Sequence, residues 1–127
     1  MKKTTRGWVR KAESDYRLVL RIAGEKDPFH DEVCFHSQQA AEKFLKALLE
    51  ELGLTIPRTH NLDDLLALLR PHHPSLGALR RGLIFLTDFA VGVRYPGEIA
   101  SKRQAVAAKR WATRSRGACR AILGLPR

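Results

Sequence analysis

The sequence of 127 residues contains only two cysteines, Cys34 and Cys119, and they lack the paired spacing of a zinc site. Two cysteines are too few for a disulfide framework, so a reducing cytoplasm is the simplest expected compartment. No apolar run approaches the ~18 residues of a membrane span, and the first residues lack the apolar stretch of a signal peptide. The sequence therefore predicts a cytoplasmic protein without a membrane span.

Signatures of known enzyme classes are also missing. The sequence has no glycine-rich phosphate loop, no HExxH motif and no GxSxG motif. Cys34 and His36 are two residues apart, whereas helical side chains meet at spacings of three or four, so we do not expect them to form a catalytic pair. We expect no metal ion and no cofactor.

Acidic residues are absent from the last quarter of the chain. The net charge is +10, and residues 99–127 carry eight basic and no acidic side chains. Such a positive field favours an anionic partner, which could be a nucleotide, a nucleic acid or an acidic protein. The alternative is that these side chains only solvate an exposed helix face.

Helical periodicity runs through the whole chain, and no alternation of β-branched residues lasts long enough for a strand. We predict a single domain spanning residues 1–127, an all-α antiparallel up-and-down bundle of four long helices plus one short helix. Asp15 falls inside the apolar arc of the first helix, so it should pair with a basic residue across the bundle. The expected helices lie at about 5–24, 29–52, 61–69, 75–92 and 101–123.

The fourth predicted helix is apolar on nearly all sides. Leu79, Leu83 and Leu86 share one stripe, whereas Phe85 and Phe89 lie on another side. One small bundle cannot easily cover such a helix, so we expect Phe85 and Phe89 to contribute to a homodimer interface. The alternative is a central helix buried within one protomer.

The fifth predicted helix separates small from basic residues. Ser101 and Gln104 have the spacing of a capping box, which marks the start of the helix. Alanines fall on one arc and permit close helix packing, whereas lysines and arginines fall on the opposite arc. The basic arc is therefore expected to face solvent or a partner.

The turn before this helix is a candidate phosphate site. Pro96 and Gly97 force the chain to turn, which fixes Arg94 and Tyr95 close to the positive end of the helix dipole. The alternative is that Arg94 pairs with a nearby carboxylate and that Tyr95 fills the bundle end. The candidate binding residues in this region are Arg94, Tyr95, Ser101, Lys102 and Arg103.

Three stretches are distinctive in combination, namely FHSQQAAEKFLKALL at residues 35–49, Thr59-His60-Asn61-Leu62, and Arg94-Tyr95-Pro96. Together they resemble the HEPN (higher eukaryotes and prokaryotes nucleotide-binding) domain family. The first helix, from Trp8 through Tyr16, also fits the family, so the resemblance covers nearly the whole chain.

The resemblance implies a homodimeric all-α bundle that binds a nucleotide or RNA phosphate. It also implies a separate nucleotidyltransferase of the MNT type as partner, in a toxin–antitoxin or defence pair. Two further candidate binding residues lie in the matching stretches, His60 and Lys43. For His60, a hydrogen bond at the start of the third helix is the simpler expectation.

Many family members are metal-independent ribonucleases that use an Arg and a His with four to six residues between them. Here the corresponding positions after Arg94 are Ile99, Ala100 and Ser101, and no histidine follows His73. Enzymatic activity is therefore left open, with little RNA cleavage expected, because such cleavage needs a general acid–base at that point. The alternatives are a ribonuclease toxin with an unusual partner for Arg94 and a non-catalytic dimeric scaffold for protein interaction.

Overall fold

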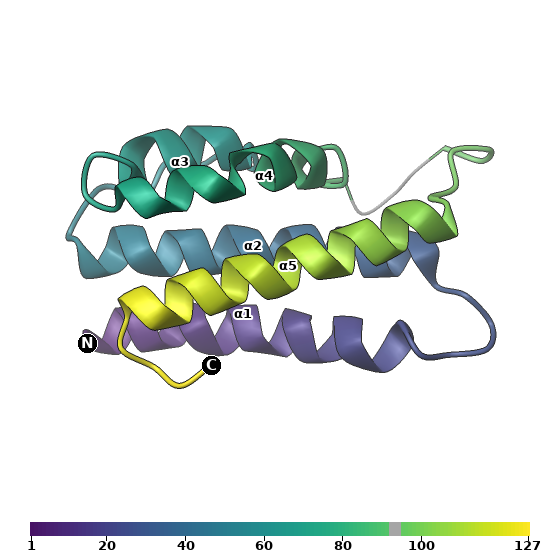
Figure 1. Cartoon of the computed structure of the whole chain (residues 1–127), viewed down its shortest axis with the longest axis horizontal. Coiled ribbons are helices and arrows are strands. Elements are labelled where there is room, and N and C mark those ends of the chain that lie inside the picture. Colours follow the sequence, from purple (N-terminus) through teal and green to yellow (C-terminus); the bar gives the residue numbers. More distant parts are fainter. Residues whose placement is uncertain (92–94) are drawn as a thin grey trace.

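A central helix organises the bundle of the computed structural model, which describes residues 1–91 and 95–127. Two long helices and a layer of short helices pack against it (Figure 1). The described part of the chain contains no strand, so the predicted all-α fold is confirmed. The elements are α1 (Lys3–Ile22), α2 (His30–Glu51), α3 (Leu62–Leu69), the 3₁₀ helix η1 (Pro74–Leu79), α4 (Arg80–Thr87) and α5 (Lys102–Ile122).

Helix α2 is the centre of the bundle. It packs against α1, α3, α4 and α5, and 13 of its 22 residues are buried. A helix buried on most sides needs apolar residues all round, which α2 supplies with Phe44, Leu45 and Leu48. Gly53, at φ 73°, follows its C-terminus and takes a left-handed conformation that favours glycine.

The fourth helix is shorter than the expected range of about 75–92. A 3₁₀ helix occupies Pro74–Leu79, and α4 continues only from Arg80 to Thr87. In a 3₁₀ helix residues three apart lie above one another, so Leu76 and Leu79 both enter the core. The described residues therefore form three long α-helices, two short α-helices and one 3₁₀ helix, with α3 and α4 covering one side of α2 (Figure 1).

Helices α1 and α5 are antiparallel and are joined by polar contacts (Figure 1). Arg116 donates two hydrogen bonds to Glu13, with distances of 2.7 and 3.2 Å, and its guanidinium stacks 5.1 Å from the Tyr16 ring. The hydroxyls of Tyr16 and Thr113 are 2.9 Å apart. Arg116 therefore holds α1 against α5, which the basic arc of the sequence did not reveal.

Neither cysteine forms a disulfide and both are buried, as expected for Cys34 as a small core residue. Burial raises the pKa of the Cys119 thiol to about 12. Since the thiolate is the reactive form, Cys119 is inert in the folded chain at neutral pH.

Candidate functional site

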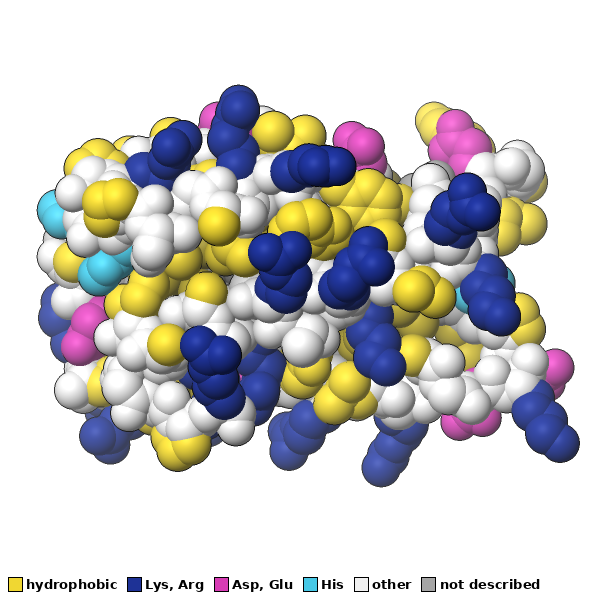
Figure 2. Space-filling view, viewed as in Figure 1, with side chains coloured by type: hydrophobic (Ala, Val, Ile, Leu, Met, Phe, Trp, Pro, Cys, Tyr) yellow, Lys and Arg dark blue, Asp and Glu magenta, His cyan; other side chains and the backbone are white. Residues whose placement is uncertain are grey.

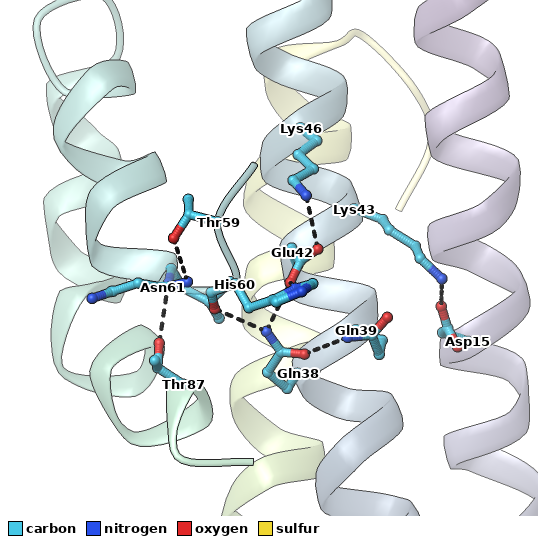
Figure 3. A network of polar contacts seen from close by, with 11 residues as sticks. Asp15, Gln38, Gln39, Glu42, Lys43, Lys46, Thr59, His60, Asn61 and Thr87 are labelled. Atoms are coloured by element: carbon cyan, nitrogen blue, oxygen red, sulfur yellow. Dashed lines mark hydrogen bonds and ion pairs between the residues drawn. The ribbon is translucent and has the colours of Figure 1, made fainter. Parts of the chain in front are cut away.

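A buried carboxylate on α2 organises the polar part of the bundle (Figure 3). Glu42 accepts hydrogen bonds from the amide of Gln38 at 3.0 Å, the ammonium of Lys46 at 2.9 Å and Nδ1 of His60 at 2.9 Å. Burial raises the pKa of the Glu42 carboxyl, but these three hydrogen bonds together lower it below its ordinary value. Glu42 is therefore an ionised, fully paired anion inside the bundle.

The segment from Thr59 to Leu62 fastens the loop before α3 to its neighbours. The amide of Gln38 donates to the carbonyl of His60 at 3.2 Å, and the backbone N–H of Leu62 donates to Oγ1 of Thr87 at 3.1 Å. Asn61 caps α3 by accepting from the N–H of Asp63. The hydrogen bond expected for His60 at the start of α3 is therefore made by its ring Nδ1 to Glu42 of α2.

His60 nevertheless leaves much of its ring in solvent. Its side chain is 69% exposed, whereas that of Glu42 is 5% exposed. The ring is held at Nδ1, so the opposite edge, which carries Nε2, is available to a ligand.

Asp15 has the basic partner that its position predicted. Lys43 on α2 contacts one carboxylate oxygen at 2.5 Å, and Nδ1 of His36 contacts the other at 2.9 Å. Lys43 was a candidate phosphate ligand, but in this structure its ammonium is held between α2 and α1 (Figure 3). Its first role is therefore to join the two helices.

The N-terminus of α5 has the expected capping box. The hydroxyl of Ser101 accepts from the N–H of Gln104 at 3.0 Å, and Gln104 accepts in return from the N–H of Ser101 at 2.9 Å. The N–H of Ala100 donates to Asp31 at 2.8 Å, which fixes the start of α5 beside the start of α2. The hydroxyl and the backbone N–H of Ser101 are therefore both engaged in the helix cap.

The other candidates near this turn are not all placed. Lys102 and Arg103 are exposed, and the side chain of Tyr95 is 80% exposed, so Tyr95 does not fill the bundle end. Arg94 lies outside the described residues. Of the five candidates, Lys102 and Arg103 present free charge beside the α5 N-terminus.

A pocket of about 510 Å³ opens beside Lys102. Lys102 and Lys109 line it from α5, and Lys26 and Phe29 line it from the α1–α2 loop. Its apolar floor includes Val33 from α2. Apolar walls with a few convergent charged groups are typical of small-ligand sites.

Of the residues that line this pocket, the sequence pointed to Lys102 alone, and Lys26, Phe29 and Lys109 are among those it missed. Lys109 belongs to the basic arc of α5, which was a usable signal. Lys26 and Phe29 lie in a loop, where periodicity gives no information about side-chain direction. Only the packing of the loop against α5 brings them to the pocket.

The two candidate interface phenylalanines differ in burial. Phe89 is 4% exposed and packs in the core, with its ring 5.3 Å from that of Phe85. Phe85 is partly buried against the same core. Exposed apolar residues in the same stretch of the sequence are Ile84, Val91 and Ile99.

The described part of the chain offers no cluster of three or more His, Cys, Asp or Glu side chains for a metal ion. Within residues 1–91 and 95–127, no helix is long and apolar enough to cross a bilayer.

Comparison with known proteins gives consistent matches. The family model for the HEPN domain matches residues 5–122. The crystal structure of TT1696 from Thermus thermophilus is 24% identical with a TM-score of 0.82, covering 94% of this chain and 98% of that chain. The crystal structure of ST0689, an archaeal HEPN homologue, is 24% identical with a TM-score of 0.76, covering 96% and 98%. No curated protein matches the sequence significantly.

Proposed function

This chain belongs to the HEPN domain family, and we propose that it binds the phosphate of a nucleotide or of RNA. The observation that carries the proposal is the pocket of about 510 Å³ that Lys26, Lys102 and Lys109 line at the N-terminal half of α5. Glu25 also lines this pocket, so its three ammonium groups face one carboxylate and leave a net positive charge. Such a charge attracts a polyanion, and the α5 dipole adds to the field. The half-exposed ring of Phe29 offers a surface on which a base can stack.

We also propose that the protein acts with a separate minimal nucleotidyltransferase in a toxin–antitoxin or defence pair. The support is membership of the family, which the sequence resemblance associates with such partners. A neighbouring reading frame with a nucleotidyltransferase signature, whose product forms a stable complex with this chain, is the expected finding.

The substitution Lys102→Ala is expected to weaken binding of ATP or of a short RNA by about tenfold. A hydrogen bond to a charged group contributes ~1.5–3 kcal/mol, and ~1.4 kcal/mol corresponds to a factor of ten. Isothermal titration of the purified chain measures the loss. Arg94→Ala is measured in the same titration, because the sequence also predicts that Arg94 binds phosphate.

The matched control is Arg110→Ala, on the same helix and exposed but outside the pocket lining. Arg110 follows the lining residue Lys109, but adjacent side chains on a helix point about 100° apart and do not face each other, so the Arg110 guanidinium does not share the pocket. Its loss should therefore be small. Equal losses for Lys102→Ala and Arg110→Ala would mean that binding is diffuse and that the pocket is not the site.

We further propose that two copies of the chain form a homodimer through exposed apolar residues around α4. Ile84 is 45% exposed and Val91 65% exposed. Sedimentation at tens of micromolar should give a dimer, and Ile84→Glu should shift it toward monomer because a carboxylate would be buried in the interface. Leu18→Glu, at an exposed apolar position on α1, is the control. A monomeric wild type would contradict the proposal.

A further inference from the structure

A second basic surface runs along the outside of α1. Five basic residues recur there at spacings of three, four and seven, which confines them to an arc of roughly 60° at 100° per residue. All five are exposed. They are Lys3, Arg6, Arg10, Arg17 and Arg21, and we call them the α1 basic stripe.

The α1 basic stripe borders the surface along which α1 and α5 meet, which holds two pockets and which we call the α1–α5 groove. Arg6, Arg10 and Arg17 line a pocket of about 510 Å³ together with Arg120 of α5. The carboxylate in this pocket is Glu13, and α5 already neutralises it.

Glu13 cannot neutralise the α1 arginines as well. Arg116 holds it with two hydrogen bonds, and Arg120 approaches it to 3.6 Å. Within the described residues, no ion pair joins Arg6, Arg10 or Arg17 to a carboxylate. Their three charges are therefore available to an external anion.

The groove has a basic pocket at each end. Helices α1 and α5 are antiparallel, so the arginine pocket, which is lined from Met1 to Arg17 along α1, meets the end of α5, and the Lys102 pocket lies where α1 ends and α5 begins. Lysine and arginine side chains gather over α5 and along the α1 edge on this face (Figure 2). Positive charge is thus spread along the groove.

We propose that a single-stranded nucleic acid lies along the α1–α5 groove, with its phosphates on Arg6, Arg10 and Arg17. This proposal rests on the phosphate binding proposed above and adds a second surface, outside the Lys102 pocket, that holds a polymeric ligand. Arg6 and Arg17 are eleven residues apart, about 16 Å along the helix, which is far more than one phosphate group spans.

An exposed aromatic ring beside the basic stripe favours nucleic acid over an acidic protein. The guanidinium groups, which four of the five residues in the α1 basic stripe carry, bind phosphate and carboxylate alike in bidentate fashion. A basic track combined with an exposed aromatic ring is typical of proteins that bind single strands, and Phe29 supplies that ring at the far end of the groove. The bases of a duplex would be stacked internally and could not reach it.

The test compares the triple variant Arg6→Gln, Arg10→Gln, Arg17→Gln with a triple variant of equal charge change. The control is Arg58→Gln, Arg70→Gln, Arg81→Gln, whose residues are exposed and lie outside both pockets. Fluorescence anisotropy with a labelled 12-nucleotide oligo(U) and the corresponding oligo(dT) measures affinity at several salt concentrations. Circular dichroism melts establish that both variants fold.

The α1 variant should lose at least tenfold in affinity for oligo(U), and the control should lose much less. The slope of log affinity against log salt should become shallower by about 2, because each phosphate contact on a single strand contributes ~0.7. Equal affinity for oligo(U) and oligo(dT) supports nucleic-acid binding in the groove, and so does a preference for oligo(U), since the proposed contacts are with the phosphates of the nucleic acid. Equal losses in the two triple variants, or no loss in either, would overturn the proposal.

Comparing the binding of ATP with the binding of oligo(U) distinguishes a failure of this inference from a failure of the proposed function. Suppose that Lys102→Ala weakens ATP binding while the α1 variant binds oligo(U) as the wild type does. Phosphate binding in the Lys102 pocket is then supported, and nucleic-acid binding along the groove is contradicted. If the wild type binds neither ATP nor oligo(U), both proposals fail. Displacement of oligo(U) from the wild type by poly-glutamate at equal charge concentration would assign the groove to an acidic protein and overturn the inference.

Discussion

The substitution Glu42→Gln is expected to lower the free energy of unfolding by about 3–5 kcal/mol, the usual cost of breaking a buried ion pair by removing one partner. Lys46 is a buried residue whose ammonium would lose its carboxylate. The hydrogen bond that holds His60 would also lose its charge. Urea denaturation at neutral pH, monitored by circular dichroism, measures the change.

The control is Glu32→Gln in the exposed first turn of the same helix. Its carboxylate interacts mainly with the helix dipole, so its removal should cost less than about 1 kcal/mol. Similar losses in the two variants would mean that the Glu42 network does not stabilise the fold.

The same carboxylate predicts a dependence of stability on pH. Its pKa is lower in the folded chain than its ordinary value of 4.5, so its stabilising effect is complete above that value. The effect is lost as the pH falls through the folded-state pKa, because the unfolded chain binds the proton first. Stability should therefore fall less steeply below pH 4.5 in Glu42→Gln than in the wild type.

The substitution Gly82→Ala is expected to destabilise the protein by about 1–3 kcal/mol, the usual cost of overpacking a core. A Cβ atom at Gly82 would lie 1.9 Å from Cδ2 of Trp111, so α4 and α5 could not keep their present approach. The better helix propensity of alanine offsets only part of this strain. Thermal and urea denaturation measure the effect.

Gly117→Ala is the matched control. Gly117 lies inside α5, and an added Cβ would meet no atom within 4 Å. This substitution should stabilise the protein by up to about 1 kcal/mol, because alanine is the better helix former. If Gly82→Ala lowers the free energy of unfolding and Gly117→Ala raises it, the loss at Gly82 comes from the contact with Trp111. A change of the same sign in both variants would contradict this explanation.

The sequence alone determined the helices whose signals are local. Periodicity and caps predicted α1, α2, α3 and α5 to within about two residues, because hydrogen bonds and caps form between residues four or fewer apart. Ser101 and Gln104 form the predicted capping box. The family was also identified from the sequence, because its motifs lie in continuous stretches.

The tertiary structure decided which charges are free. Arg116 and Lys102 belong to the same basic arc in sequence, yet Arg116 binds Glu13, which is 103 residues away, while Lys102 lines a pocket. Such pairings depend on how helices pack, and local sequence patterns carry no record of them. The fourth helix ends at Thr87, and the N–H groups of Asp88, Phe89 and Ala90 then bond to carbonyls three residues back in a tighter turn. Phe89 packs in the core at this turn, a placement that the apolar periodicity of the sequence did not predict.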